Sequence, residues 1–240
     1  MKIVKVKHAV FIIALVIIAD QALKIWIKTS YHAPGEVTKV LGLNWFQLYF
    51  IENSGMAWGW NFGNDAGKMI LTLFRLGAVI FGTWYIGKII RKGYKKGFII
   101  CVALIYAGAL GNLLDSMFYG MIFDKGLHYD PAVQQYVGYS GVASFSTDGY
   151  SSFLHGSVVD MLYFPIIDSK FPSWFPFVGG EDFQFFSPIF NLADASISAG
   201  VITLFIFQKR FFRKPESTHE ATAETSPGTE TGESKVEVSS

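Results

Sequence analysis

Four long apolar stretches dominate the pattern of hydrophobic and polar positions along the chain. They cover about residues 8–27, 69–87, 97–119 and 188–207. A helix that spans a bilayer needs about 20 mostly apolar residues, and each stretch is long enough. The sequence therefore predicts an all-α membrane protein whose four transmembrane helices lie within residues 1–214.

The first stretch could be taken for a cleaved signal peptide, because three lysines precede it. Its apolar run is longer than that of a signal peptide. Asp20, Gln21 and Lys24 also occupy its far end, where a small-residue cleavage site would lie. We therefore predict an uncleaved first helix.

The distribution of basic residues predicts the orientation of the helices. Lys and Arg gather in three short segments, at 2–7, 88–96 and 209–214, and are sparse in the long connections at 28–68 and 120–187. Short loops rich in Lys and Arg stay in the cytoplasm. Both termini are therefore predicted to be cytoplasmic, and both long connections are predicted to be outer loops.

The two predicted outer loops have compositions of their own. Residues 37–53 are rich in β-branched and aromatic residues, which predicts a small β element against the membrane surface. Residues 171–188 combine aromatics, Pro and Gly, which indicates an irregular interfacial segment. Residues 215–240 are mostly Thr, Ser, Glu and Gly and are predicted to be a disordered cytoplasmic tail.

Charged residues are scarce in this chain. Only 16% of residues are charged, against about 25% in a soluble domain, so lipid is the expected solvent for much of the chain. The net charge of +1 gives no reason to expect a nucleic-acid partner. Ionisable groups within a membrane span are costly and usually mark function.

Polar residues gather near the outer ends of three predicted helices. Asp20 and Lys24, four residues apart, share one face of the first helix and can pair. The other such residues are Asn112 and Asp115 in the third helix, and Asn191 and Asp194 in the fourth. The predicted topology places them all in one layer, just below the outer surface.

The outer loops and the second helix can add to this layer. Asp160 lies late in the second loop, and Glu52, Asn53 and Gly55 of the first loop can reach the layer from above. Arg75, in the second helix, is expected to snorkel or to pair with an outer carboxylate.

Two carboxylates close together in such an environment share one proton, and the pair can activate water for peptide hydrolysis. The sequence has no GxSxG, HExxH or Cys–His arrangement, and we predict no metal and no cofactor. His155 is a lone histidine, and the only cysteine, Cys101, is expected to be packing within an apolar stretch.

Two other classes of function remain open at this point. Intramembrane carboxylates also serve ion- or proton-coupled carriers. Four helices without an internal repeat are few for a carrier, and its carboxylates should continue toward the midplane. A non-catalytic scaffold is the third possibility, which the clustered Asp and Asn residues disfavour.

Five short motifs occur in order: DQALK at 20–24, ENSGMAWG at 52–59, GNLLD at 111–115, VVD at 158–160 and FNLADASI at 190–197. With these motifs, residues 8–210 resemble the bacterial lipoprotein signal peptidases, also called signal peptidase II. The resemblance implies an aspartic endopeptidase of the bacterial inner membrane. Such an enzyme cleaves diacylglyceryl-modified prolipoproteins before the lipidated cysteine, at the outer face.

The resemblance also implies roles for individual residues. The catalytic residues would be Asp160 and Asp194. Residues that support the site or bind substrate would be Asn53, Gly55, Asn112, Asp115 and Asn191. Asp20 and Lys24 would be a structural pair. The resemblance further implies contact with membrane lipids, a monomer, and binding of a cyclic depsipeptide inhibitor of the globomycin kind.

The chain departs from the family pattern at two places. Ser116 follows the GNLLD aspartate where the family usually has Arg. In most members the catalytic aspartate comes nine residues after that aspartate, which here is Asp124, whereas the VVD motif ends at Asp160. We favour Asp160 and interpret residues 120–156 as an insertion in the outer loop.

Overall fold

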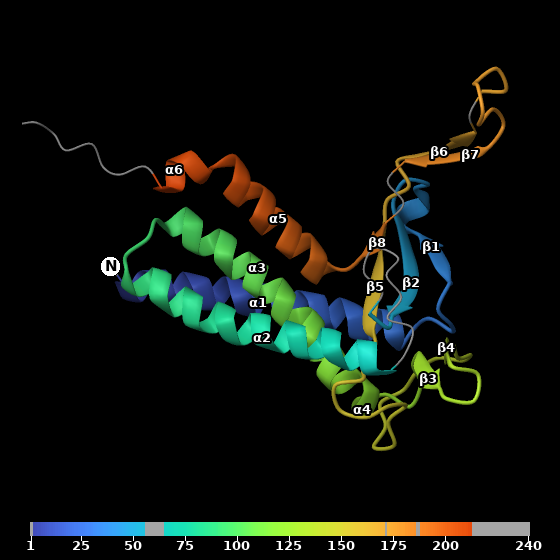
Figure 1. The fold of residues 1–240 in the computed structure, drawn as a ribbon, viewed down its shortest axis with the longest axis horizontal. Helices are drawn as coiled ribbons and strands as arrows, with labels where there is room; N and C mark the ends of the chain where they lie inside the picture. Colours follow the sequence, from blue (N-terminus) through green and yellow to red (C-terminus); the bar gives the residue numbers. More distant parts are fainter. Residues whose placement is uncertain (1, 56–64, 171, 186–187, 213–240) are drawn as a thin grey trace, which may run out of the picture.

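The computed structural model describes residues 2–55, 65–170, 172–185 and 188–212 of the 240. A bundle of helices forms one part of the molecule, and a small sheet lies across one end of the bundle (Figure 1). We call this the sheet end. The predicted tail at 215–240 lies outside the described residues.

Three helices in the described part are long and apolar enough to cross a membrane. They are α1 (Lys2–Lys28), α2 (Asp65–Arg91) and a helix built from three continuous pieces, α3 (Lys96–Leu114), η2 (Asp115–Tyr119) and α4 (Gly120–Ile122). Three predicted spans are thus found as helices. The piece η2 is a π-helical turn, a feature that is frequent at functional sites.

The fourth apolar helix, α5 (Leu192–Ile206), has 15 residues and is followed by the short α6 (Gln208–Phe212). It begins four residues later than the sequence predicts. Ile189 and Phe190 pair in the sheet as β8, and Asn191 caps the helix, so the polypeptide cannot be helical before Leu192.

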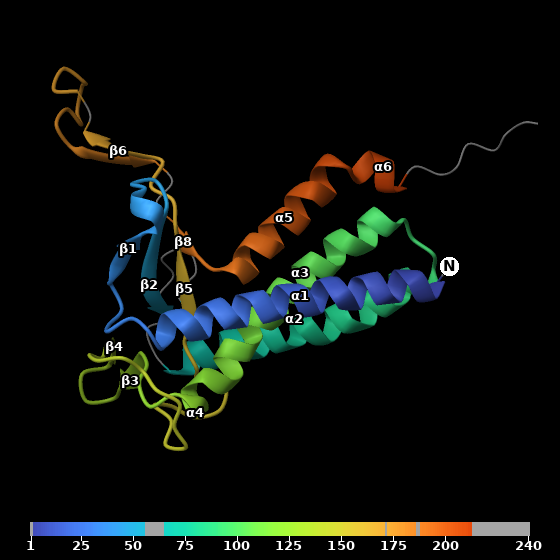
Figure 2. The same ribbon diagram turned by 180° about the vertical axis from the view of Figure 1, so that it is seen from behind.

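Helix α3 packs against α1, α2 and α5 (Figures 1 and 2). Its contact with α5 needs small residues. A Cβ atom on Gly108 would lie 2.2 Å from the carbonyl oxygen of Ala193, and one on Gly111 would lie 3.2 Å from the Cβ of Ala193. Glycine therefore lets the backbones approach closely, as is common between membrane helices. This approach brings the first turn of α5 to the sheet end of α3.

The sheet has the strand order β1-β2-β5-β8, and all neighbours are antiparallel. Its strands are β1 (Val37–Lys39), β2 (Gln47–Asn53), β5 (Val158–Tyr163) and β8 (Ile189–Phe190), and the 3₁₀ turn η1 (Val40–Gly42) follows β1. The predicted β element is therefore present. Pairing of β2 with β5 sets Ile51 opposite Asp160, so the two long connections meet at the candidate site.

Residues 120–156 fold against the sheet end. They include a hairpin of β3 (His128–Asp130) and β4 (Gln135–Val137). Their side chains share a hydrophobic cluster with the ends of two helices and with the sheet. Its buried members are Ile27, Tyr31, Phe50, Tyr119, Phe123, Ala143, Val159 and Met161. The segment, which we call the insertion, is thus part of the packed structure.

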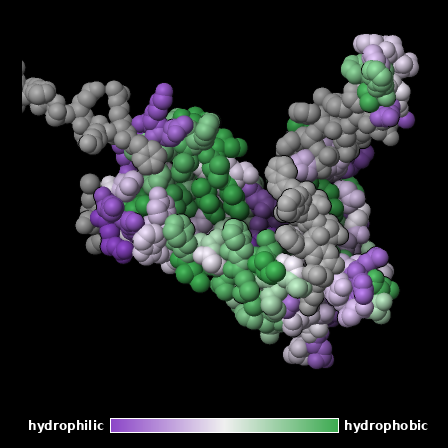
Figure 3. All heavy atoms as spheres, in the orientation of Figure 1, coloured by the Kyte–Doolittle hydropathy of each residue, from purple (hydrophilic) through white to green (hydrophobic). Residues whose placement is uncertain are grey.

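A second hairpin, β6 (Ile167–Lys170) with β7 (Asp182–Phe185), projects from the body of the molecule (Figures 1 and 2). The sequence predicts an irregular segment at 171–188, whereas its described part includes strand β7. Trp174 and Phe177 are strongly exposed near the tip. Hydrophobic surface also covers the helices, with hydrophilic residues gathered at the end away from the sheet (Figure 3).

Candidate active site

Asp160 and Asp194 come from different elements and are joined through two amides. The side-chain nitrogen of Asn191 donates to Asp160 Oδ1 at 2.7 Å, and that of Asn112 donates to Asp194 Oδ1 at 2.7 Å. The Asn191 nitrogen also lies 3.0 Å from Asn112 Oδ1. Strand β5, the end of α3 and the start of α5 thus meet at this pair.

The start of α5 is fixed by a capping box. Asn191 Oδ1 accepts the Asp194 backbone N–H at 2.9 Å, and Asp194 Oδ2 accepts the Asn191 backbone N–H at 3.4 Å. These bonds satisfy donors that a helix start leaves without partners. Asp20 Oδ1 accepts the Ala193 N–H at 2.8 Å, which ties α5 to α1. The Asp194 carboxylate is therefore held in one orientation.

Burial changes the acidity of Asp160, whose side chain is almost fully enclosed. Burial, and then the nearby Asp194 carboxylate, raise the pKa of Asp160 to about 7. Both effects disfavour the ionised form. At neutral pH the pair therefore holds one proton for part of the time, which is the state that general acid–base hydrolysis needs.

A buried cation lies behind the pair. Lys24 Nζ is 2.9 Å from Asp20 Oδ2, 2.7 Å from Asp115 Oδ2 and 2.9 Å from Asn112 Oδ1. The side chain of Gln21 donates to Asp115 Oδ1 at 2.8 Å. The predicted contact between Asp20 and Lys24 exists, and it extends to Asp115 and Asn112. Gln21, within the DQALK motif, has a contact that the sequence did not suggest.

Arg75 contacts Ser116, the residue at which the chain departs from the predicted motif pattern. Its Nη1 donates to Ser116 Oγ at 2.8 Å, and Ser116 Oγ donates to the Asn112 carbonyl at 3.0 Å. Arg75 is also in electrostatic range of both aspartates of the pair. A guanidinium from α2 thus reaches Ser116 on η2. Arg75 donates a hydrogen bond to a serine, whereas the sequence predicted that its side chain would snorkel to the membrane surface or pair with an outer carboxylate.

The other candidate residues lie as follows. Asp124 is exposed in the insertion, and its Oδ1 accepts the Ser144 N–H at 2.7 Å. Asn53 ends β2, and its Oδ1 accepts the N–H of Gly55 at 2.8 Å. Gly55 has φ +114°, a conformation that favours glycine.

His155 lies in the insertion, with Nδ1 3.0 Å from Ser152 Oγ. Cys101 is buried, in the packing position that the sequence predicts. Within the described ranges, no group of His, Cys, Asp and Glu side chains is arranged to hold a metal ion.

Comparison with known proteins adds to this geometry. The family described as signal peptidase (SPase) II matches residues 12–210. A lipoprotein signal peptidase of Porphyromonas gingivalis is 43% identical over 205 residues, which cover 83% of this chain and 81% of the relative. A lipoprotein signal peptidase of Amoebophilus asiaticus is 31% identical over 214 residues, covering 88% and 81%.

A solved structure of a bacterial membrane enzyme superposes with a TM-score of 0.51 at 23% identity, covering 88% of this chain and 94% of that one. The chain therefore has the fold of a helical membrane enzyme with a small β element. It belongs to the signal peptidase II family, the peptidases that remove signal peptides from lipoproteins. The carrier interpretation is not supported.

Proposed function

We propose that the chain is an aspartic endopeptidase that cleaves diacylglyceryl-modified prolipoproteins immediately before the lipidated cysteine, with Asp160 and Asp194 as the catalytic pair. One observation carries this assignment. Two carboxylates from β5 and α5 are linked through Asn112 and Asn191, and one of them has a pKa close to neutral.

The pair would act on a water molecule held between its carboxylates. The ionised carboxylate takes a proton from the water as the oxygen attacks the scissile carbonyl, and the protonated carboxyl gives its proton to the carbonyl oxygen. The tetrahedral intermediate then collapses. The C–N bond breaks as the protonated carboxyl gives its proton to the amine of the departing cysteine and the other carboxylate takes the hydroxyl proton of the intermediate, which restores the pair with one proton. No covalent enzyme intermediate forms.

The neighbouring residues would hold the pair in this state. Asn112 and Asn191 each donate a hydrogen bond to one aspartate. These bonds fix the orientation of both carboxylates and add no formal charge to the site. Asp115 joins Lys24 to the main chain of Val159, next to Asp160. Asp20 and Lys24 would be a structural pair that supports the site. Asn53 and Gly55, at the end of β2, would position the substrate backbone.

An apolar groove on the helices would receive the signal peptide. Helices α2 and α5 flank α3, and between them lies a cavity of about 400 Å³. Its lining is almost wholly apolar: Ala78, Phe81, Gly82, Tyr85, Phe98, Val102, Ile105, Tyr106, Ala109 and Leu204. An apolar peptide helix fits such a groove better than a polar chain does.

The topology proposed for the bacterial inner membrane has four spans and two cytoplasmic termini. Helix α5 would be the fourth span, with α6 and its basic residues at the cytoplasmic surface. The sheet end, with the aspartate pair, would then be at the outer face. The exposed aromatics Trp174 and Phe177 would suit the headgroup region. The proposed unit is a monomer, and a globomycin-type inhibitor should bind it.

The test uses the full-length protein in detergent with two synthetic substrates, a prolipoprotein peptide with the diacylglyceryl group and the same peptide without it. Wild-type protein should release signal peptide from the lipidated substrate only. Asp160→Asn and Asp194→Asn should each lower kcat by at least about 10⁴-fold while the thermal unfolding temperature is retained. Asp124→Asn is the matched control and should be fully active. An inactive Asp124→Asn beside an active Asp160→Asn would overturn the assignment.

A further inference from the structure

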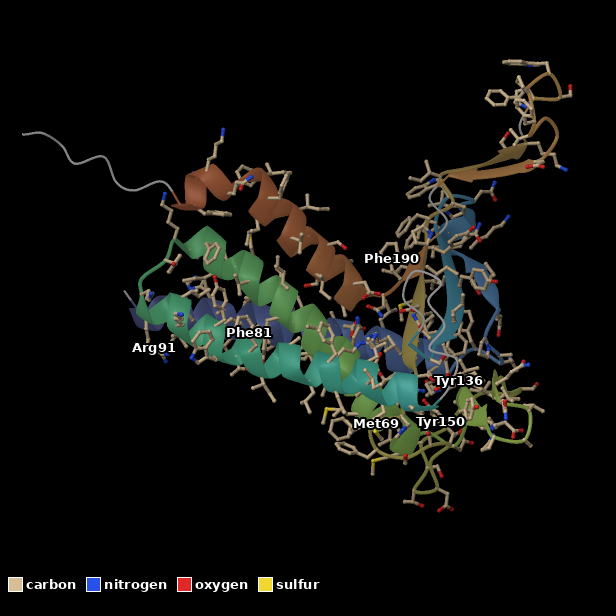
Figure 4. The ribbon with its side chains drawn as sticks, in the orientation of Figure 1. Met69, Phe81, Arg91, Tyr136, Tyr150 and Phe190 are labelled. Carbon is tan, nitrogen blue, oxygen red and sulfur yellow. The ribbon has the colours of Figure 1, made fainter. Side chains whose placement is uncertain are left out.

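A second cavity, of about 430 Å³, lies beside Asp160. It is lined by strand residues, by one aspartate of the pair and by the insertion: Ile51, Glu52, Asn53, Ser54, Leu127, Tyr136, Asp160 and Ile189. Leu127 and Tyr136 belong to the insertion, so this segment forms one wall of a cavity that reaches Asp160. In Figure 4, Tyr136 lies beyond the sheet end of α2.

The main chain of this wall is held on both sides. The Leu127 N–H donates to Glu52 Oε2 at 2.7 Å, and its carbonyl accepts from Ser157 Oγ at 3.0 Å. Ser157 in turn accepts from Lys68 Nζ at 3.0 Å. The ammonium of Lys68 also lies 5.2 Å from the centre of the Tyr136 ring, within cation–π range. Both wall residues are therefore fixed by buried polar groups.

The charge of Glu52 is compensated within the protein. Its carboxylate forms a salt bridge with Lys28, and Oε1 accepts from the Tyr139 hydroxyl at 2.7 Å. Lys28 Nζ also lies 5.1 Å from the centres of the Phe123 and Tyr150 rings. Glu52 therefore presents no uncompensated charge to the cavity. Asp160 is then the acidic residue of the lining whose charge matters for a bound side chain.

We propose that Leu127 and Tyr136 form a binding subsite for the residues that immediately follow the lipid-modified cysteine, and that the subsite selects uncharged apolar side chains. The proposal rests on the proposed function. The signal peptide would lie among the helices, so the chain after the scissile bond must leave at the sheet end, where this cavity lies. A residue of the insertion would thus determine substrate preference.

The selectivity follows from the lining. Ile51, Leu127, Ile189 and the Tyr136 ring offer apolar contacts. An acidic side chain in the cavity would lie beside the Asp160 carboxylate. The nearby Lys68 ammonium already donates to Ser157 and faces the Tyr136 ring. Burying a second negative charge next to the first is costly. Apolar residues after the cysteine should therefore be cleaved faster than acidic ones.

The experiment compares two diacylglyceryl-modified prolipoprotein peptides, with either Leu-Leu or Glu-Glu after the cysteine, in competition for the full-length protein in detergent. Wild type should favour the Leu-Leu peptide. Tyr136→Ala and Leu127→Ala should each lower the ratio of kcat/KM values roughly tenfold, the discrimination that one apolar contact gives. Leu127→Lys should shift the ratio further toward Glu-Glu.

Val133→Ala is the matched control, because Val133 is exposed on the same hairpin and does not line the cavity. It should leave the ratio unchanged. A reduced rate with an unchanged ratio in all three wall variants would overturn the subsite, and so would an equal shift in Val133→Ala. Should Leu127→Ala unfold, Leu127→Met keeps the volume and should give a smaller shift. Failure of wild type to cleave either peptide would instead overturn the proposed function.

Discussion

Lys24 and Lys28 lie one turn apart on α1, and both ammonium groups are completely buried, yet they join different parts of the molecule. Lys24 contacts two carboxylates and an amide on α1, α3 and η2. Lys28 pairs with Glu52 on β2, in a cage of rings from the insertion and the end of α4.

The difference separates what holds the aspartate pair from what holds the wall beside it. The side-chain oxygen of Asn112 accepts a hydrogen bond from Lys24, and its nitrogen donates one to Asp194. Lys24 is therefore linked to the pair through a single residue, Asn112. Lys28 acts on Glu52, which holds the main chain of Leu127. The two lysines therefore allow the core of the site and its added wall to be tested separately.

The largest effect is expected from Lys24→Met. Removal of the cation leaves Asp20 and Asp115 buried without compensation, and breaking a buried pair costs about 3–5 kcal/mol. We expect a strongly lowered unfolding temperature in detergent and no cleavage of the lipidated substrate. A variant that unfolds at the wild-type temperature would show that this cation does not organise the site.

A somewhat smaller loss is expected from Lys28→Met, about 3 kcal/mol, because Glu52 keeps hydrogen bonds from Tyr139 and Leu127. The double variant Lys28→Met/Glu52→Gln removes the uncompensated charge and should recover most of the unfolding temperature. Cleavage should persist in both variants. Complete inactivity of the folded double variant would contradict the separation between the two lysines.

Asn191 offers a way to separate stability from catalysis within the Lys24 region. Serine also caps helices, so Asn191→Ser keeps the cap and should be more stable than Asn191→Ala by about 1 kcal/mol. Both lose the amide that donates to Asp160. We expect both to lower kcat about 10²-fold through misplacement of that carboxyl. Wild-type kcat in Asn191→Ser would show that this amide does not position Asp160.

The smallest effect is expected from Ser116→Ala, which removes one hydrogen bond from Arg75. The cost should be about 1 kcal/mol, and kcat should fall less than tenfold. Thermal unfolding and initial rates with the lipidated substrate measure both. A loss of stability and of kcat as large as that of Lys24→Met would show that Ser116 and Arg75 support the site as strongly as Lys24 does.

The helices, and the gathering of polar residues at one end of them, could be predicted from the sequence because both depend on local signals. Apolar stretches predict helices, and Asp20 with Lys24 share a face by spacing alone. The motif at 158–160 also favoured Asp160 over Asp124, and the structure has Asp160 bonded to Asn191 and Asp124 exposed in the insertion.

The remaining contacts depend on pairing over long distances in sequence. Nothing local predicts that Arg75 meets Ser116, 41 residues away, or that Lys28 is enclosed by rings of the insertion. The late start of α5 has the same cause, because Ile189 and Phe190 are apolar enough for a helix but pair with β5. Sheet pairing overrides the local pattern at this point.

The most direct test of the shared proton is the pH dependence of kcat/KM for the lipidated substrate. The pKa of Asp160 is about 7, well above the value of about 4 for an unfolded Asp. A rise in pH from about 4 to above about 7 removes the shared proton. It also lowers the free energy of unfolding, because the folded state binds that proton more tightly than the unfolded state does. We predict a bell-shaped profile whose alkaline limb falls near pH 7. A constant kcat/KM from pH 6 to about 9, with the protein folded throughout, would contradict a catalytic pair that shares one proton.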